Sequence, residues 1–147
     1  MRIWRVAKRA FADLSGEGAR LVGGRWNSPG RPMVYAAAEA SLALLEVRAH
    51  LDLPFDLVPD DFVFMEIETG SAEVEDMALP PAAAECLHNG DRWLTEGRTP
   101  LLRVPSVVVS FSSNVLINPR HPGSRDVSIA ALHPFQFDRR LWSSGTT

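Results

Sequence analysis

The sequence predicts a domain of the α+β class, and three observations support this prediction. The chain has 147 residues, which suits one domain built around one hydrophobic core. Short apolar segments typical of strands are mixed with a few helical segments at irregular spacing, unlike the regular alternation of a doubly wound parallel sheet. No internal repeat, low-complexity segment or linker divides the chain. We therefore expect a single domain over residues 1–147.

Composition and charge indicate a soluble protein of a reducing compartment. Hydrophobic residues make up 46% of the chain and charged residues 22%, with a net charge of −3, which argues against a dedicated nucleic-acid-binding protein. Cys86 is the only cysteine, so no intrachain disulfide is possible. The basic segment 1–14 lacks the apolar region of a secretory signal, and no stretch approaches the roughly 20 apolar residues of a membrane-spanning helix. We expect a cytoplasmic protein without membrane contact.

The first half of the chain is predicted to contain three strands and one helix. Residues 2–6 alternate between polar and apolar side chains, which is typical of a strand, and glycines between residues 16 and 24 predict a loop or turns. Residues 32–37 predict a second strand and residues 62–68 a third. The segment 38–51 is rich in strong helix formers and ends before Pro54, so it predicts a helix.

The second half is predicted to alternate between helices and strands. Residues 69–81 form an acidic connection that we expect to be exposed. A short helix is predicted over 81–87, broken at Asn89-Gly90, with a second short helix over 91–97. The β-branched run within 104–119 is typical of a buried strand, and residues 133–142 predict a last strand.

The segment around Gly23-Gly24 is the first candidate binding site. The two glycines allow positive φ angles and a close approach of a ligand to the backbone. Arg25 and Asn27 alternate with Trp26, so the guanidinium and the amide can face one side and bind a pyrophosphate. The spacing matches neither a P-loop nor the G-x-G-x-x-G fingerprint. Taken alone, the segment is more typical of a β-hairpin that carries a solvated arginine.

Glu46 is the second candidate. It borders the apolar stripe that Leu42, Leu45 and Ala49 are predicted to form along the helix. A carboxylate at the edge of a buried surface suits the stabilisation of positive charge. The alternative is an ion pair with a basic neighbour on the same helix.

The third candidate is a polar cluster late in the chain. The polar residues in or beside the β-branched run are Ser106, Ser112, Ser113, Asn114, Asn118 and His121. Neither serine has the G-x-S-x-G context of a hydrolase nucleophile. Without an H-E-x-x-H pattern or a cysteine cluster, no metal site is expected. Such residues are also common as strand caps and turn formers.

The order of these segments resembles one known family. The segment GEGARLVGGRWNSPGRPMVYAAAEASLALLEVRAHL and the later segments LLRVPSVVVSFSSNVLINPRHPGS and FQFDRRLW are similar to the RES-domain family, named for arginine, glutamate and serine. The resemblance extends from Trp4 to Trp142. It implies a fold like that of the ADP-ribosyltransferases, with twisted, mostly antiparallel sheets and a few short helices. It also implies a bacterial toxin that degrades NAD⁺ and is neutralised by an Xre-type helix-turn-helix antitoxin.

Matching the family motifs assigns residues to this activity. Catalytic roles are implied for Arg25, Tyr35, Glu46 and Ser106, with Ser112 as the weaker match to the family serine. Contacts with NAD⁺ are expected for Arg5, Arg25, Asn27, Tyr35 and Asn118. The glutamate would stabilise an oxocarbenium-like transition state or hold the ribose hydroxyls, and the arginines would bind the pyrophosphate. The tyrosine would stack against nicotinamide, and the serine would hydrogen-bond the amide or the ribose.

The resemblance leaves open which group accepts the ADP-ribose and whether the domain is catalytic. NAD⁺ would be a substrate rather than a bound cofactor, cleaved by a phosphorylase with inorganic phosphate as co-substrate or by a glycohydrolase with water. One alternative is an ADP-ribosyltransferase that modifies a macromolecule. Another is a non-catalytic NAD-binding or regulatory domain. A homodimer is expected from family analogy alone, and direct nucleic-acid binding is not expected.

Overall fold

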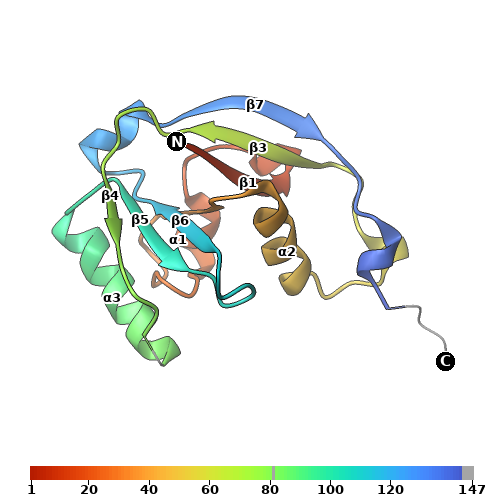
Figure 1. Cartoon of the computed structure of the whole chain (residues 1–147), viewed down its shortest axis with the longest axis horizontal. Helices are drawn as coiled ribbons and strands as arrows, with labels where there is room; N and C mark the ends of the chain where they lie inside the picture. The colour runs from red at the N-terminus through yellow and green to blue at the C-terminus, as the bar shows by residue number, and fades with distance from the viewer. Residues whose placement is uncertain (81, 144–147) are drawn as a thin grey trace.

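The computed structural model describes residues 1–80 and 82–143 and contains a seven-stranded sheet in the order β4-β5-β6-β2-β1-β3-β7 (Figure 1). Only the β4–β5 pair is parallel, so the predicted α+β class with mostly antiparallel strands is confirmed. The strands are β1 (Arg2–Lys8), β2 (Val34–Ala37), β3 (Phe62–Glu68), β4 (Val74–Asp76), β5 (Leu101–Pro105), β6 (Ser113–Ile117) and β7 (Ser128–Pro134). The helices are α1 (Glu17–Val22), α2 (Ala40–His50) and α3 (Ala83–Glu96). Short 3-10 turns cover Arg9–Phe11, Phe55–Leu57, Pro122–Asp126 and Arg139–Leu141.

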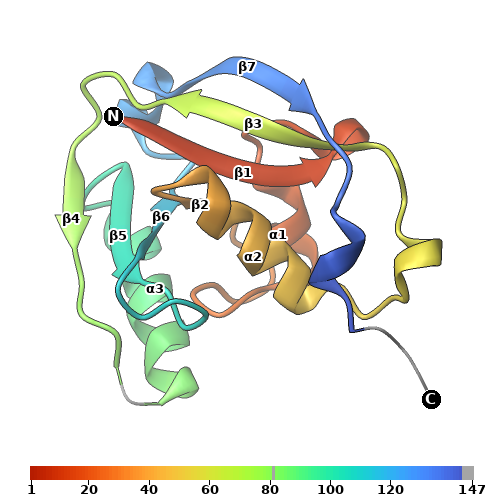
Figure 2. The same ribbon diagram turned by 45° about the vertical axis from the view of Figure 1, so that its right-hand side comes forward.

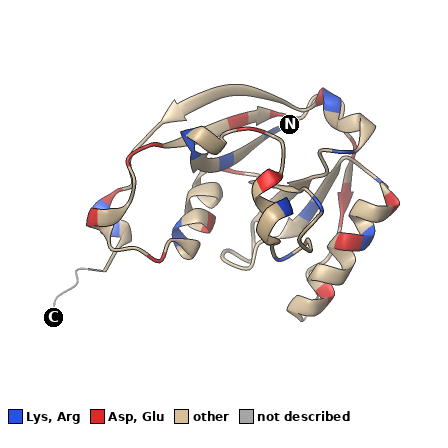
Figure 3. Cartoon of the chain, turned by 180° about the vertical axis from the view of Figure 1, so that it is seen from behind, with Lys and Arg blue, Asp and Glu red and all other residues tan. Residues whose placement is uncertain are grey.

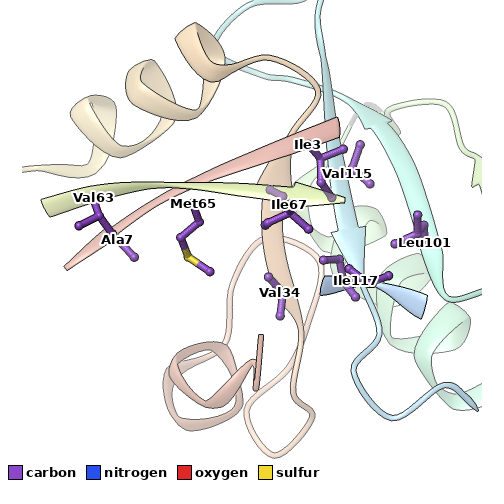
Figure 4. Packing of buried hydrophobic residues seen from close by; sticks show 11 residues of the cluster. Ile3, Ala7, Val34, Val63, Met65, Ile67, Leu101, Val115 and Ile117 are labelled. Atoms are coloured by element: carbon purple, nitrogen blue, oxygen red, sulfur yellow. The ribbon is translucent and has the colours of Figure 1, made fainter. Parts of the chain in front are cut away.

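Alternation along the strands gives the sheet two different faces. On one face, apolar side chains from both halves of the sheet meet in the main core, which Figure 4 shows in close view. Its fully buried members include Ile3, Met65, Ile67, Leu101 and Val115. The opposite face is covered by α2 at β1 and β2 and by α3 at β5 and β6, and Figures 1 and 2 show these helices well apart. The second face therefore has an uncovered region between the two helices.

Helix α2 lies within the predicted segment 38–51, but its buried stripe differs from the predicted one. Leu42 and Ala43 are buried, whereas Ala49 is exposed. Relative to the predicted orientation, the helix is rotated about its own axis, because its apolar contacts with the sheet come from Leu42, Ala43 and the half-buried Val47. This rotation turns the neighbouring edge of α2, which carries Glu46, toward the uncovered region.

Helix α3 is continuous, so the predicted break at Asn89-Gly90 is wrong. Gly90 is buried where α3 touches the backbone at Trp26, and a Cβ atom at this position would overlap the Trp26 carbonyl oxygen. The glycine is therefore required for close packing and does not end the helix. The helix ends at Gly97, which has a φ of 60°. The predicted start of the segment at Pro81 lies outside the described residues.

The β-branched run does not form one strand. Strands β5 and β6 are separated by a loop over residues 106–112, in which Val107, Val108 and Phe111 are exposed. The chain leaves β5 at Ser106 because the Ser106 hydroxyl accepts hydrogen bonds from the backbone N–H groups of Val108 and Val109, both at 3.0 Å. This local turn replaces the sheet hydrogen bonds that the sequence pattern predicted.

Two further predictions are corrected at the edges of the sheet. Residues 74–76 of the predicted acidic connection form β4, because they pair in parallel with β5. The predicted last strand over 133–142 is wrong beyond Pro134, where β7 ends. Asp138 then begins a 3-10 turn by accepting a hydrogen bond from the Arg140 backbone N–H. Phe137 packs against Phe135 and Trp142 rather than extending the sheet.

Charged residues of both signs are interspersed over the visible face in Figure 3. Arginines often lie beside carboxylates, as in the Arg98–Glu75 and Arg103–Asp76 pairs. In the described part of the chain, none of the helices is both long enough and apolar enough to cross a membrane.

Candidate active site

A cavity of about 520 Å³ occupies the uncovered region between α2, the glycine segment and the second face of the sheet. This volume lies within the range of small-molecule binding sites. The sheet contributes side chains at alternating positions of three strands: Trp4, Val6, Tyr35, Ala37, Asn114 and Leu116. Helix α2 contributes one face: Ala43, Glu46, Val47 and His50. The glycine segment closes the third side with Val22, Gly23, Gly24, Arg25 and Trp26.

Glu46 is held in the cavity wall by two side chains from distant parts of the sequence. Its Oε1 atom accepts a hydrogen bond from the Ser106 hydroxyl at 2.6 Å and another from Asn114 Nδ2 at 2.9 Å. Hydrogen bonds to an ionised carboxylate are stronger than those between neutral groups. The carboxylate is therefore fixed in orientation at the junction of α2, β5 and β6.

Ser106 is buried behind Glu46, with 1% of its surface exposed, and is not among the residues that line the cavity. Its hydroxyl donates to Glu46 and accepts from Val108 and Val109. Ser112 meets this cluster through its backbone oxygen, which accepts from the Ser106 N–H at 2.9 Å. Of the two serines considered from the sequence, Ser106 is the one whose side chain contacts the glutamate.

The glycine segment folds tightly against β2. Gly23 has a φ of 77°, and the Gly24 N–H donates to the Asn27 carbonyl at 2.9 Å. A Cβ atom on Gly24 would lie 2.6 Å from the hydroxyl oxygen of Tyr35. Both glycines are thus required, the first by its conformation and the second by the close approach of the tyrosine.

Tyr35 lines the cavity and fixes the glycine segment through its hydroxyl. This hydroxyl donates to Asn27 Oδ1 at 2.7 Å and accepts from the Trp26 N–H at 3.0 Å. The Asn27 amide in turn donates to the carbonyls of Ala19 and Arg31. Asn27 is completely buried and does not line the cavity, so the structure gives it internal partners in place of the expected ligand contact.

Two arginines contribute positive charge to the cavity. The Arg5 guanidinium is anchored by the carbonyls of Phe11 and Asp13, at 3.0 and 3.3 Å. Burial lowers the pKa of Arg5, and the nearby Asp13 carboxylate opposes this effect. Arg25 belongs to the glycine segment and is exposed. Both arginines are thus among the cavity-lining residues, and the Arg5 guanidinium also contacts Met65 Sδ at 3.2 Å.

Asn118 lies away from this cavity. It is 5% exposed, and its Oδ1 atom accepts from the Arg120 N–H at 3.1 Å. It lines a separate cavity of about 190 Å³ together with His121. The expected contact between Asn118 and the ligand of the main cavity is therefore not part of the observed arrangement.

The model of the RES domain matches residues 2–138 of the sequence. The chain belongs to the RES domain family. Curated relatives include the Prs ADP-ribosylating toxin of Sphingobium sp., which is 36% identical with 94% of each chain covered. The Toxin Res of Pseudomonas putida is 37% identical, with 97% of this chain and 100% of that protein covered. The Toxin Res of Yersinia enterocolitica is 31% identical, with 96% and 99% covered.

A solved structure supports the fold of this RES domain. A chain in the crystal structure of the Mycobacterium tuberculosis MbcT–MbcA toxin–antitoxin complex superposes with a TM-score of 0.73 and is 19% identical. The match covers 92% of this chain and 84% of that one. The two chains share one fold, which in this protein is of the α+β class, as the sequence predicted.

Three further residues of the RES cavity were given no site role from the sequence, although Asn114 belongs to the late polar cluster. Trp4 and His50 line the cavity, and Asn114 both lines it and contacts Glu46. His50 follows Glu46 by one helical turn, and Asn114 lies on the same strand face as the cavity-lining Leu116, two residues later. Among the described residues, no three His, Cys, Asp or Glu side chains are grouped so that they could hold a metal ion.

The titration of Tyr35 provides a direct test of this geometry. Burial raises the pKa of Tyr35 to about 12, against about 10 for an exposed tyrosine. Since Tyr35 is the only tyrosine in the chain, tyrosinate absorbance reports this group alone. We expect a midpoint near pH 12 in the folded protein and near pH 10 in denaturant.

The same shift predicts a pH dependence of stability. The folded pKa lies above the unfolded one, so the stability linked to Tyr35 is fully present below pH 10 and is lost as the pH rises toward 12. The Tyr35→Phe variant should lack this component of the alkaline decline in the free energy of unfolding. A midpoint near pH 10 in the folded protein would contradict the buried hydroxyl.

Proposed function

We propose that this RES domain is the toxin of a toxin–antitoxin pair and cleaves the nicotinamide–ribose bond of NAD⁺. The observation that carries the proposal is the orientation of Glu46, whose Oε1 atom is held by Ser106 and Asn114 in the wall of a ligand-sized cavity. Names of relatives support the toxin role, since the curated proteins of Sphingobium, Pseudomonas and Yersinia are all described as toxins.

The chemistry of NAD⁺ matches a fixed carboxylate. Nicotinamide leaves as a neutral molecule from a pyridinium, so its departure requires no general acid. Positive charge develops on the ribose as the bond breaks, and a carboxylate held in place stabilises this charge without reorganisation. Glu46 Oε1 is occupied by its two partners, so Oε2 is the oxygen that faces the reacting ribose.

Arg5 and Arg25 are proposed to bind the pyrophosphate of NAD⁺. Both line the cavity, and a guanidinium forms paired hydrogen bonds with phosphate oxygens. Arg5 is anchored on the Phe11 and Asp13 carbonyls, whereas Arg25 projects from the folded glycine segment. The aromatic ring of Tyr35 provides a flat surface for nicotinamide, while its hydroxyl holds the segment that carries Arg25.

The structure supports a positioning role for Ser106 rather than contact with the substrate. We expect Ser106→Ala to lower kcat about ten- to hundredfold, the range expected for the loss of one hydrogen bond to a charged group. Turnover should persist because the Asn114 bond to Glu46 remains. Steady-state kinetics of nicotinamide release measure the effect. The control is Ser112→Ala, which should match the wild type, and an effect of Ser112→Ala as large as that of Ser106→Ala would contradict the assignment.

The reaction products identify the nucleophile that attacks the anomeric carbon of the ribose, which is either water or inorganic phosphate. Hydrolysis of NAD⁺ gives ADP-ribose, nicotinamide and a proton, whereas phosphorolysis with inorganic phosphate gives ADP-ribose phosphorylated at the anomeric carbon and nicotinamide. The purified protein is incubated with NAD⁺ with and without phosphate, and the products are separated by chromatography. Dependence on phosphate would identify a phosphorylase, and activity without phosphate a glycohydrolase. The proposal fails if neither reaction releases nicotinamide.

An ADP-ribosyltransferase is the second candidate, favoured by the description of the Sphingobium relative as an ADP-ribosylating toxin. The same cavity would then cleave NAD⁺, and a group on a macromolecule would replace water or phosphate. NAD⁺ labelled in its adenylate half distinguishes the two functions in a cell extract. Label that remains on protein or nucleic acid would indicate transfer, and label found only in small molecules would indicate degradation.

The expected partner is an Xre-type helix-turn-helix antitoxin, and the expected compartment is the cytoplasm. The MbcT–MbcA structure is described as a toxin–antitoxin complex, which supports an antitoxin partner for this chain. Induced expression should stop growth and deplete cellular NAD⁺, and co-expression of the antitoxin should restore both.

The mass of the purified protein in solution tests whether it forms the proposed homodimer.

A further inference from the structure

Two oxygen atoms on cavity-lining residues have no hydrogen-bond donor within residues 1–80 and 82–143. Both bonds to the Glu46 carboxylate end on Oε1, and the Asn114 amide makes its bond through Nδ2. Glu46 Oε2 and Asn114 Oδ1 are therefore without a partner. In the same residues, no buried side-chain nitrogen or oxygen lacks a partner, so these two oxygens are accessible. The cavity thus presents a pair of free acceptors.

The orientation of the Asn114 amide follows from its partner. A carboxylate only accepts hydrogen bonds, so the nitrogen of the amide faces Glu46 and the oxygen lies on the other side. The backbone of Asn114 is paired with Ala37 on one side and Val104 on the other. This double pairing fixes the base of the side chain. The two free oxygens thus belong to the two side chains that this hydrogen bond joins.

A ligand that matches this arrangement needs two adjacent hydrogen-bond donors. The ribose next to the pyridinium carries such a pair, the vicinal 2′- and 3′-hydroxyls, whereas the pyrophosphate offers only acceptors. The family resemblance already implies that the glutamate holds ribose hydroxyls, and we propose that Asn114 Oδ1 is the second acceptor, which binds one hydroxyl of this diol while Glu46 Oε2 binds the other. The inference rests on the proposed function and adds Asn114 to the cavity as a specificity-determining residue. It restricts the substrates to pyridinium ribonucleosides with both hydroxyls free.

The pairing also links recognition to the orientation of the carboxylate. Asn114 donates to Glu46 and accepts from the ligand, so the diol is held by two groups that already constrain each other. A ligand that lacks one hydroxyl leaves one acceptor without a donor, and this lowers its affinity.

The test compares three ligands that cannot be cleaved. These are NAD⁺ with a carbocyclic nicotinamide ribose, and the same molecule without its 2′- or without its 3′-hydroxyl. Calorimetric titration of the full chain gives each Kd. In the wild type we expect each deoxy ligand to bind about three- to tenfold more weakly than the parent. In Asn114→Ala, one deoxy ligand should bind as tightly as the parent, and the other should keep its penalty.

Asn114→Asp is the matched variant. It retains an oxygen acceptor and places a second carboxyl group against Glu46, so overall affinity changes while both penalties should remain. Thermal unfolding verifies that each variant is folded. The inference is overturned if both deoxy ligands still bind Asn114→Ala more weakly than the parent does. It is also overturned if the wild type binds all three ligands equally, and this second comparison needs no variant. Nicotinamide release from NAD⁺ is measured separately, so a failure of the diol contacts is distinguished from a failure of the proposed cleavage.

Discussion

Glu46→Gln is expected to reduce nicotinamide release from NAD⁺ by about a hundred- to a thousandfold in kcat, the range seen when one preorganised electrostatic group is removed. Glutamine has the shape of glutamate, and its carbonyl oxygen can still accept the hydrogen bonds of Ser106 and Asn114. The substitution therefore removes the negative charge and the second acceptor without creating a cavity. Single-turnover kinetics at saturating NAD⁺ measure the chemical step.

The control for this variant is Glu39→Gln, which removes an exposed carboxylate at the start of the same helix. It should retain the wild-type rate because Glu39 does not line the cavity. Thermal unfolding should be nearly unchanged in both variants. A kcat for Glu46→Gln within threefold of the wild type would remove the central residue from the mechanism.

Gly90→Ala is expected to destabilise the protein, although alanine normally stabilises a helix by about 1 kcal/mol relative to glycine. A Cβ atom at this position would overlap the carbonyl oxygen of Trp26, which belongs to the backbone and cannot rotate away. Overpacking of this kind costs about 1–3 kcal/mol or more. We therefore expect a lower melting temperature, measured by calorimetry.

The same variant should also damage the cavity. The Trp26 N–H donates to the Tyr35 hydroxyl, so displacement of Trp26 moves the segment that carries Arg25. Gly18→Ala is the matched control, since Gly18 lies in helix α1 and a Cβ there would meet no atom within 4 Å. It should leave the melting temperature unchanged or raise it slightly. Equal melting temperatures for the two variants would contradict the contact between α3 and the glycine segment.

Elements that depend on local pattern could be predicted from the sequence. Strand β3 alternates over Phe62–Glu68 and has these bounds in the structure, and helix α2 begins and ends within two residues of its predicted limits. Elements that depend on distant partners could not. Strand β4 exists because it pairs with β5, and the pairing partner is not visible in its own three residues. The continuity of α3 depends on Trp26, which lies far away in the sequence.

The candidate site shows the same limit. The residue types around Arg25, Tyr35 and Glu46 indicated a ligand site, and the structure brings all three to one cavity. The sequence could not separate ligand contacts from internal ones, so Asn27 was expected at the ligand but is buried against backbone carbonyls. Asn114 carries no local signal that connects it to a glutamate 68 residues earlier. The two side chains come into contact because β6 pairs with β2, and α2 packs on β2.

The most direct test of the account is the release of nicotinamide by the purified full chain. NAD⁺ is incubated with the wild type and with Glu46→Gln, free of antitoxin and with phosphate present, and nicotinamide is quantified over time. The account predicts that nicotinamide accumulates in proportion to wild-type protein and stays near background with Glu46→Gln. Intact NAD⁺ after hours with folded wild-type protein would contradict it.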